Sequence, residues 1–189
     1  QSTSVRRRLA PLATVMDRYL PERDFGELAV PFQCVAARIE DCRETWFTTG
    51  PIAPAVLASC SVPGLFPPVQ IDGAHYLDGG LVHSIPVGRA IALGAERIFV
   101  LQVGRVEQPL AVPRMPWEVA AVAFEISRRH RYAQEISGVP DSVALHVLPS
   151  GTEVAPTVSL GQASGRRMRE RADAAYAAAT AYLGAHQED

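Results

Sequence analysis

The segment 75–86, HYLDGGLVHSIP, constrains the fold most, because it joins a short predicted hairpin to a predicted helix. Asp72-Gly73, just upstream, is a dipeptide that two-residue type I′ hairpin turns prefer. Asp78 then precedes two glycines, whereas a plain turn needs at most one glycine with positive φ. Two glycines let the backbone pass close to another group while the aspartate is held at the edge of a sheet. The junction is therefore either an active-site corner or a tight crossover.

The rest of the chain alternates between strand-like and helix-like stretches. Strand composition occurs in five places: 30–39, 43–50, the hairpin 66–80, and the continuous apolar runs 97–103 and 143–149. Helical patterns occur at 8–20, 54–64, 86–93, 117–136 and, after a loop, up to 184. The continuous apolar runs predict strands buried on both faces of a parallel sheet. We therefore expect an α/β layered fold, with a mostly parallel buried sheet flanked by helices, as a single domain over residues 1–189.

The cysteines suit a reducing compartment. A two-residue turn at 40–41 would place Cys34 opposite Phe47, and this pairing separates Cys34 from Cys42. A disulfide is therefore not expected, and we expect all three cysteines, Cys60 included, to be buried as small hydrophobic side chains. With no signal segment or transmembrane run in the sequence, a cytoplasmic location is expected.

The charged residues exclude several functions. All 18 basic residues are arginine, which excludes chemistry that needs a lysine, such as a Schiff base. The net charge of −2 gives no global attraction to nucleic acid. Neither G-x-G-x-x-G nor G-x-x-x-x-G-K-[ST] occurs in the sequence, so a nucleotide-binding domain is not expected.

Asp78 ends a predicted strand, and ligands bind outside the carboxyl ends of strands in open α/β sheets. Its carboxylate could act as a base, orient one, hold a metal, or bond backbone amides as turn aspartates do. His75 and His83 lie on opposite sides of the turn, so we expect no metal site. We interpret His83 as a hydrogen-bonding residue at the helix entry, with general-base catalysis as the alternative.

Further motifs surround Asp78 in a fixed order: SVPGLFPPV at 61–69, a proline-started helix at Pro86, LGA at 93–95 and then a buried strand. Over residues 30–104 this combination resembles the patatin-like phospholipases. The resemblance implies hydrolysis of lipid acyl esters by a Ser-Asp dyad, with Asp78 as the base and Gly79 and Gly80 shaping the corner that presents it. It also implies no metal or organic cofactor, a lipid or ester substrate, and peripheral contact with a membrane.

The nucleophile of that family lies in a G-x-S-x-G elbow, which this sequence lacks. The nearest stretch, GQASG at 161–165, has a different spacing and follows Asp78. Ser59 and Ser61 are interpreted as hydrogen-bonding residues at a helix end. We therefore expect the chain to be the C-terminal portion of a patatin-like hydrolase, inactive alone, with the missing N-terminal half or a self-associating copy as its partner. The alternative function is a non-catalytic scaffold that binds lipid or a protein.

Overall fold

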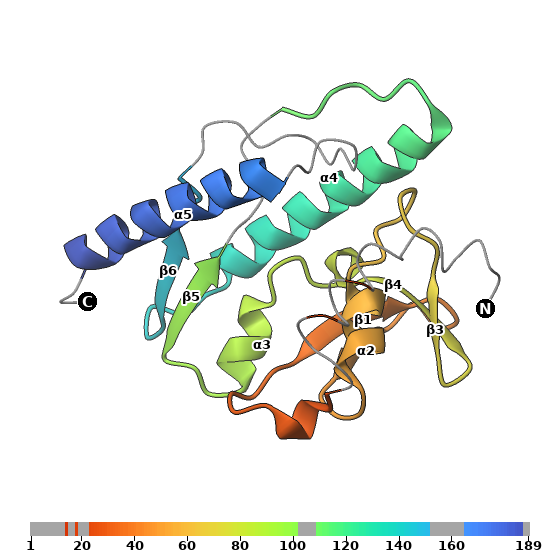
Figure 1. Ribbon diagram of the computed structural model, residues 1–189, viewed down its shortest axis with the longest axis horizontal. Helices are drawn as coiled ribbons and strands as arrows, with labels where there is room; N and C mark the ends of the chain where they lie inside the picture. The colour runs from red at the N-terminus through yellow and green to blue at the C-terminus, as the bar shows by residue number, and fades with distance from the viewer. Residues whose placement is uncertain (1–13, 15–17, 19–22, 102–108, 152–164, 187–189) are drawn as a thin grey trace. The chain divides into compact units, whose positions relative to one another are not determined.

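The computed structural model describes residues 14, 18, 23–101, 109–151 and 165–186 (Figure 1). These residues form two compact units. The first contains the described residues up to Pro86 together with Leu110–Ile136, and the second contains Val87–Pro109 together with the residues from Ser137 onward. A single domain over 1–189 stays a prediction. The helix predicted over 8–20 lies almost entirely outside the described residues.

The first unit is built on a four-stranded sheet with the strand order β2-β1-β4-β3. Its strands are β1 (Cys34–Arg38), β2 (Glu44–Phe47), β3 (Val69–Ile71) and β4 (Ala74–Asp78). Both predicted hairpins are confirmed. Cys34 pairs with Phe47 in the first hairpin. In the second, Asp72 and Gly73 have φ values of 49° and 83°, the two positive angles that a type I′ turn requires.

The prediction of a mostly parallel sheet is wrong. All three strand pairs of this sheet are antiparallel, and β4 lies beside β1 with Ala36 opposite Asp78 (Figure 1). The tight connections after β1 and β3 can join only antiparallel neighbours, because a parallel pair needs a crossover of a dozen or more residues. The alternation of strands and helices along the sequence therefore did not predict the relative directions of the strands correctly. The α/β character of the fold is confirmed.

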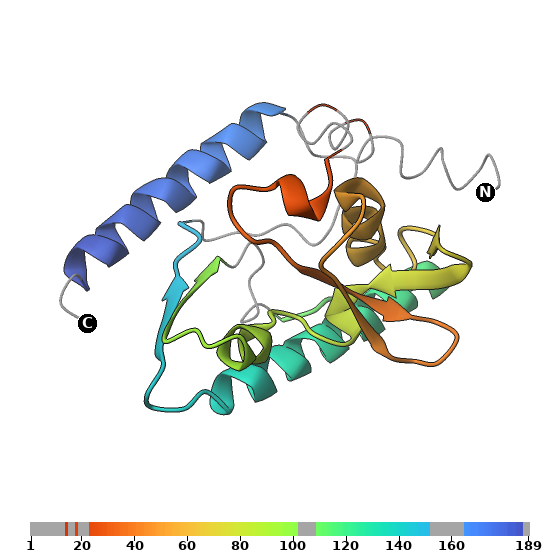
Figure 2. The same cartoon turned by 90° about the horizontal axis from the view of Figure 1, so that it is seen from below.

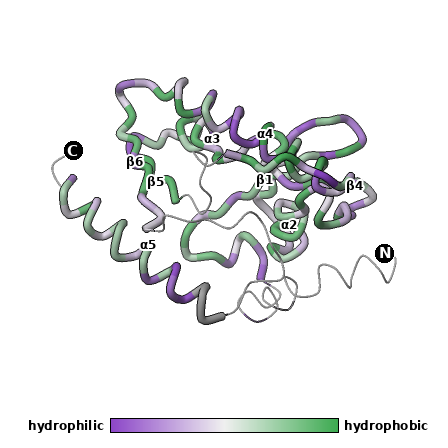
Figure 3. The backbone as a smooth tube through the Cα atoms, turned by 90° about the horizontal axis from the view of Figure 1, so that it is seen from above, coloured by the Kyte–Doolittle hydropathy of each residue, from purple (hydrophilic) through white to green (hydrophobic). Residues whose placement is uncertain are grey.

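Helix α2 (Ile52–Ser59) packs against β1, β3 and β4 and supplies much of the core of the first unit. Pro54 lies in its first turn, where the missing amide hydrogen has no cost. The helix is apolar along most of its length, as Figure 3 shows in green. Ala58 is fully buried and packs with Ala36 and Tyr76 of the sheet. The helix ends at Ser59, earlier than the predicted 64.

Three more helical elements of the first unit have both ends in the described part of the chain. They are the short 3₁₀ helices η1 (Phe25–Glu27) and η2 (Gly79–Leu81), and the long helix α4 (Pro116–Ser137), whose last residue belongs to the second unit. Helix η1 begins with a capping box, in which Asp24 accepts from the Gly26 amide and Glu27 accepts from the Asp24 amide. Helix α4 matches the prediction for 117–136 closely.

The second unit contains a parallel pair, β5 (Arg97–Leu101) and β6 (Ala144–Leu148), with helices α3 (Val87–Ala92) and α5 (Gly165–Ala185) (Figure 2). Gly94 has a φ of 88° and ends α3 as predicted. The prediction that β5 is buried on both faces is wrong, because its residues alternate between buried and exposed. Phe99 and Leu101 are 45% and 76% exposed. Among the described residues, no helix is long and apolar enough to cross a membrane.

Candidate active site

Asp78 is the last residue of β4 and the N-cap of η2, so strand and helix both fix its backbone. Its amide donates to the Ser61 carbonyl oxygen over 3.0 Å. One carboxylate oxygen, Oδ1, accepts the Gly80 amide over 2.7 Å. The carboxylate is therefore held in one place by main-chain groups, as an N-cap aspartate is. Asp78 is only partly exposed.

The two glycines after Asp78 make room for close packing. Neither has a positive φ, so the turn itself does not require them. A Cβ atom on Gly79 would lie 2.2 Å from the carbonyl oxygen of Val35 in β1. A Cβ atom on Gly80 would lie 2.9 Å from the Phe124 ring of α4 and 3.0 Å from Asp78 Oδ1. Both positions are buried, and each permits an approach that a side chain would block.

Burial raises the pKa of Asp78 from its ordinary 3.8 to about 6, although the Gly80 amide and the charge of Arg128 act in the opposite direction. Arg128 is itself held by Glu125, through hydrogen bonds of 2.8 and 2.7 Å from its Nε and Nη2. A carboxylate with a pKa near 6 is largely ionised at neutral pH but still binds a proton readily. That is the property a general base needs.

Ser61, Cys60 and Cys34 are unsuited to nucleophilic attack as the structure holds them. Ser61 is fully buried, and its hydroxyl donates to the Leu57 carbonyl over 2.8 Å. This is the helix-end hydrogen bond that the sequence indicated for Ser61. Burial raises the pKa of Cys60, with a further contribution from the charge of Asp78. Burial also raises the pKa of Cys34 to about 12, so both thiols stay protonated at neutral pH.

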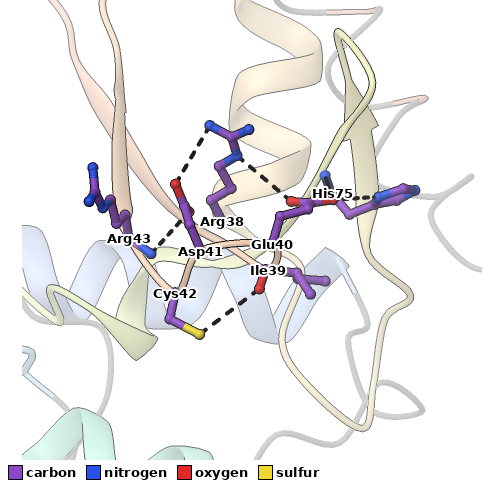
Figure 4. A network of polar contacts seen from close by, with 7 residues as sticks. All are labelled: Arg38, Ile39, Glu40, Asp41, Cys42, Arg43 and His75. Carbon is purple, nitrogen blue, oxygen red and sulfur yellow. Dashed lines mark hydrogen bonds and ion pairs between the residues drawn. The ribbon is translucent and has the colours of Figure 1, made fainter.

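The expectation that all three cysteines are buried is wrong, because Cys60 is only partly buried and Cys42 is exposed. Cys42 lies in the loop between β1 and β2, with a φ of 57°. Glu40 of the same loop contacts His75 of β4, with 2.8 Å between Glu40 Oε1 and His75 Nδ1, and Arg38 forms ion pairs with Glu40 and Asp41 (Figure 4). His75 therefore interacts with Glu40 of the hairpin loop.

His83, three residues after Gly80, contacts two carboxylates that its sequence surroundings did not indicate. Its Nδ1 lies 2.9 Å from Glu135 Oε1 in α4, and its Nε2 is hydrogen-bonded to Glu44 in β2. Glu135 and Glu44 are distant from His83 in sequence and form no spacing motif with it, so only the fold brings them together. In the part of the chain that the structure describes, no group of three or more His, Cys, Asp and Glu side chains is placed to hold a metal ion.

Comparison with known families gives a match over the part of the chain that contains the corner. Residues 6–91 match the family profile described as Patatin-like phospholipase. Residues 6–91, here called the patatin-like segment, are similar to that family. The match begins upstream of 30–104, the part whose motifs carry the resemblance, and ends before β5. It contains Asp78 with both glycines.

The chain also matches curated proteins. An uncharacterized NTE family protein of Mycobacterium tuberculosis is 30% identical over 70 residues, which cover 37% of this chain and 19% of that protein. Lysophospholipase nte1 of Emericella nidulans is 34% identical over 76 residues, 40% of this chain and 5% of that protein. Lysophospholipase NTE1 of Phaeosphaeria nodorum is 35% identical over 77 residues, 41% and 5% respectively. The chain thus spans a small part of the length of these relatives.

Proposed function

We propose that the chain is part of a lipid acyl hydrolase and supplies the aspartate of a Ser-Asp dyad. The observation that carries the proposal is the state of Asp78, a carboxylate held by main-chain hydrogen bonds, with a pKa raised to about 6 by burial, inside the patatin-like segment. The substrate class is an acyl ester: a phospholipid, a lysophospholipid or a simpler carboxylester. The names of the fungal relatives support the lysophospholipid within this class.

In the proposed reaction a serine hydroxyl attacks the acyl carbonyl while Asp78 accepts its proton. Backbone amides stabilise the negative charge that develops on the carbonyl oxygen. The alcohol leaves with a proton, and the acyl group stays on the serine. Water then attacks this ester, again with Asp78 as the base, and the fatty acid is released. In the described part of the chain, Oδ1 of Asp78 is taken by Gly80, which leaves Oδ2 for the serine.

The serine of the dyad comes from outside the sequence of this chain. No G-x-S-x-G elbow occurs in the 189 residues, and Ser61 is buried with its hydroxyl engaged by Leu57. A base without a nucleophile to activate cannot form the acyl-enzyme. We therefore propose that a further polypeptide segment supplies both the serine elbow and the oxyanion loop.

The 189-residue chain by itself should therefore not hydrolyse p-nitrophenyl esters or lysophospholipids above the rate without protein. The measurement is release of p-nitrophenol and of free fatty acid by the purified chain, with a commercial serine esterase as a positive control. Turnover that persists on purification and disappears in Ser59→Ala or Ser61→Ala would contradict the proposed division of the dyad.

A longer polypeptide that adds a serine elbow upstream of the chain should gain esterase activity. Covalent labelling with a fluorophosphonate probe identifies the nucleophile, because the probe reacts with an activated serine. We expect the label on the elbow serine and none on the 189-residue chain. Labelling of Ser59 or Ser61 in the longer polypeptide would count against the proposal.

A further inference from the structure

His83 lies in a position to hold the corner that carries Asp78. Its own amide donates to the Gly79 carbonyl over 2.7 Å, so its backbone is part of the turn that follows the two glycines. Its ring reaches two other elements, Glu135 of α4 and Glu44 of β2. The loop after the glycines is thereby tied to a helix and a strand that are distant from it in sequence.

The hydrogen bonds of the ring define its charge. A neutral imidazole has one N–H donor, and an imidazolium has two. Both ring nitrogens of His83 face a carboxylate oxygen, and a carboxylate can only accept. Two such bonds form together only when His83 carries two protons and a positive charge.

Other charged groups of α4 hold the neighbouring residues of the same loop. Arg131 donates to the Val82 carbonyl over 3.3 Å, and Arg128 approaches the Ser84 hydroxyl at 3.4 Å. Charged groups from two elements therefore face the His83 loop: Glu44 from β2, and Glu135, Arg131 and Arg128 from α4. His83 is 26% exposed and Glu135 15%, so water screens this pair less than a surface pair.

We propose that His83 is a positioning residue, which in its charged form clamps the Gly79-Gly80 corner to β2 and α4 and so fixes the direction of the Asp78 carboxylate. The clamp is inferred from contacts within this chain and does not depend on the proposed hydrolase function. Only the effect of the clamp on turnover rests on the proposed hydrolase function. The experiments that test the clamp do not measure catalysis.

The pH range of the clamp follows from its contacts. Burial alone would lower the pKa of His83, but hydrogen bonds to Glu135 and Glu44, with their charges, raise it above the ordinary 6.5. A raised pKa in the folded state means that the clamp contributes its full stability below the ordinary value. This stability is lost as the pH rises through the raised value. The clamp is therefore fully closed below the ordinary pKa of 6.5 and opens as the pH rises through the raised pKa.

The first test is the titration of the histidine rings by NMR in the 189-residue chain. His83→Gln identifies the His83 signal, which should titrate above pH 6.5. Glu135→Gln and Glu44→Gln should each move its midpoint down, whereas Glu40→Gln, which removes the partner of His75, should leave it unchanged. A His83 midpoint at or below the ordinary value, or a midpoint that neither variant lowers, overturns the clamp.

Tryptophan emission provides an independent reading of the same event. The rings of Trp46 and His83 lie 5.5 Å apart, and a protonated imidazole quenches a tryptophan nearby. In a Trp117→Phe background, which leaves Trp46 as the sole tryptophan of the sequence, emission should rise with pH at the His83 midpoint. The rise should be absent in His83→Gln. An identical rise in both proteins overturns the assignment.

The positioning role is tested by hydrogen exchange of the Gly80 amide, the group that holds Asp78 Oδ1. We expect its protection, corrected for the intrinsic pH dependence of exchange, to fall across the His83 titration. His83→Gln should show low protection at every pH, and His75→Gln should behave as wild type. Should His83→Gln fail to fold, Glu135→Gln serves in its place, with partial loss of protection expected. Equal Gly80 protection in wild type and both His83 and Glu135 variants overturns the proposal.

Discussion

Asp78→Asn lowers kcat by about 10²- to 10⁴-fold in a polypeptide that carries both residues of the dyad, because a positioned general base contributes about that much. KM changes little, since the carboxylate is not proposed to bind the acyl chain. The asparagine side chain keeps an oxygen that can accept the Gly80 amide, so the corner keeps its hydrogen bond. The measurement is steady-state hydrolysis of a chromogenic ester above pH 7, where the wild-type carboxylate is ionised.

The same variant should be at least as stable as wild type at neutral pH. The pKa of Asp78 rises from 3.8 in the unfolded chain to about 6 in the folded one, so the folded protein holds the proton more tightly. The contribution of Asp78 to stability is therefore greatest below 3.8 and is lost as the pH rises through about 6. Between about pH 4 and about pH 7.5 the loss amounts to roughly 2 kcal/mol, which Asp78→Asn should not show.

Asp72→Asn is the matched control for this experiment. Asp72 is an exposed aspartate in the β3–β4 turn, and Asn-Gly suits a type I′ turn as well as Asp-Gly does. We expect wild-type kcat and wild-type stability at neutral pH from this variant. If Asp78→Asn instead keeps a near wild-type kcat and unfolds more easily, Asp78 is a turn residue and the catalytic proposal is wrong.

Gly79→Ala should destabilise the first unit by about 3 kcal/mol or more, at the upper end of the usual effect of overpacking. The new methyl group would lie 2.2 Å from the Val35 carbonyl oxygen and 2.8 Å from Val35 Cγ1. Val35 is in β1, which has a strand on either side, so its backbone cannot move aside without disturbing both. The loss is measured by urea unfolding followed by circular dichroism, with soluble expression as the coarser reading.

Gly26→Ala provides the comparison within the same unit. A Cβ atom on Gly26 would meet only Asp24 Oδ1 at 3.8 Å, which is ordinary van der Waals contact, and its φ is not positive. We expect a change of less than about 1 kcal/mol, in the stabilising direction, because alanine restricts the unfolded chain. Equal unfolding midpoints for the Gly79 and Gly26 variants would show that the close approach at Gly79 does not constrain the corner.

The local structure of the chain could be predicted where a turn fixes it. Asp72-Gly73 favours one backbone arrangement, the type I′ turn, and this turn predicts the hairpin of β3 and β4. The pairing of Cys34 with Phe47 followed in the same way from the position of the first turn. Gly94 likewise marked the end of α3. In each case residues close in sequence decide the outcome.

Strand direction and burial could not be read in this way, because both depend on which strand becomes the neighbour. The run at 97–101 is apolar enough to be buried on two faces, yet Phe99 and Leu101 are exposed. The pairing of β4 with β1, in which Ala36 lies opposite Asp78, closes a long stretch of chain and leaves no local pattern. A continuous apolar run thus predicts a strand, but it predicts neither the burial of that strand nor its neighbours in the sheet.

In the candidate site, too, the sequence indicated the residues of a local motif but not their tertiary contacts. Asp78 and the glycines form a contiguous motif, so the sequence could indicate them. The contacts that surround them come from elsewhere: Phe124 lies against Gly80, and Glu135 is 52 positions from His83. A glutamate on a long polar helix has no feature that distinguishes a partner of His83 from a solvated side chain. These contacts follow from tertiary packing alone.

The backbone hydrogen bond from residue 78 to Ser61 bears on how such proteins diverge over evolution. A main-chain amide pairs in the same way whatever side chain its residue carries, so the crossover from β4 to η2 does not depend on a carboxylate. A change from aspartate to asparagine takes a single nucleotide substitution and keeps the acceptor for Gly80. Descendants that lose the proposed reaction can therefore retain the architecture at little cost and become binding proteins. The same glycines, in contrast, are open to almost no replacement, so in a lineage of such descendants the glycines should outlast the aspartate.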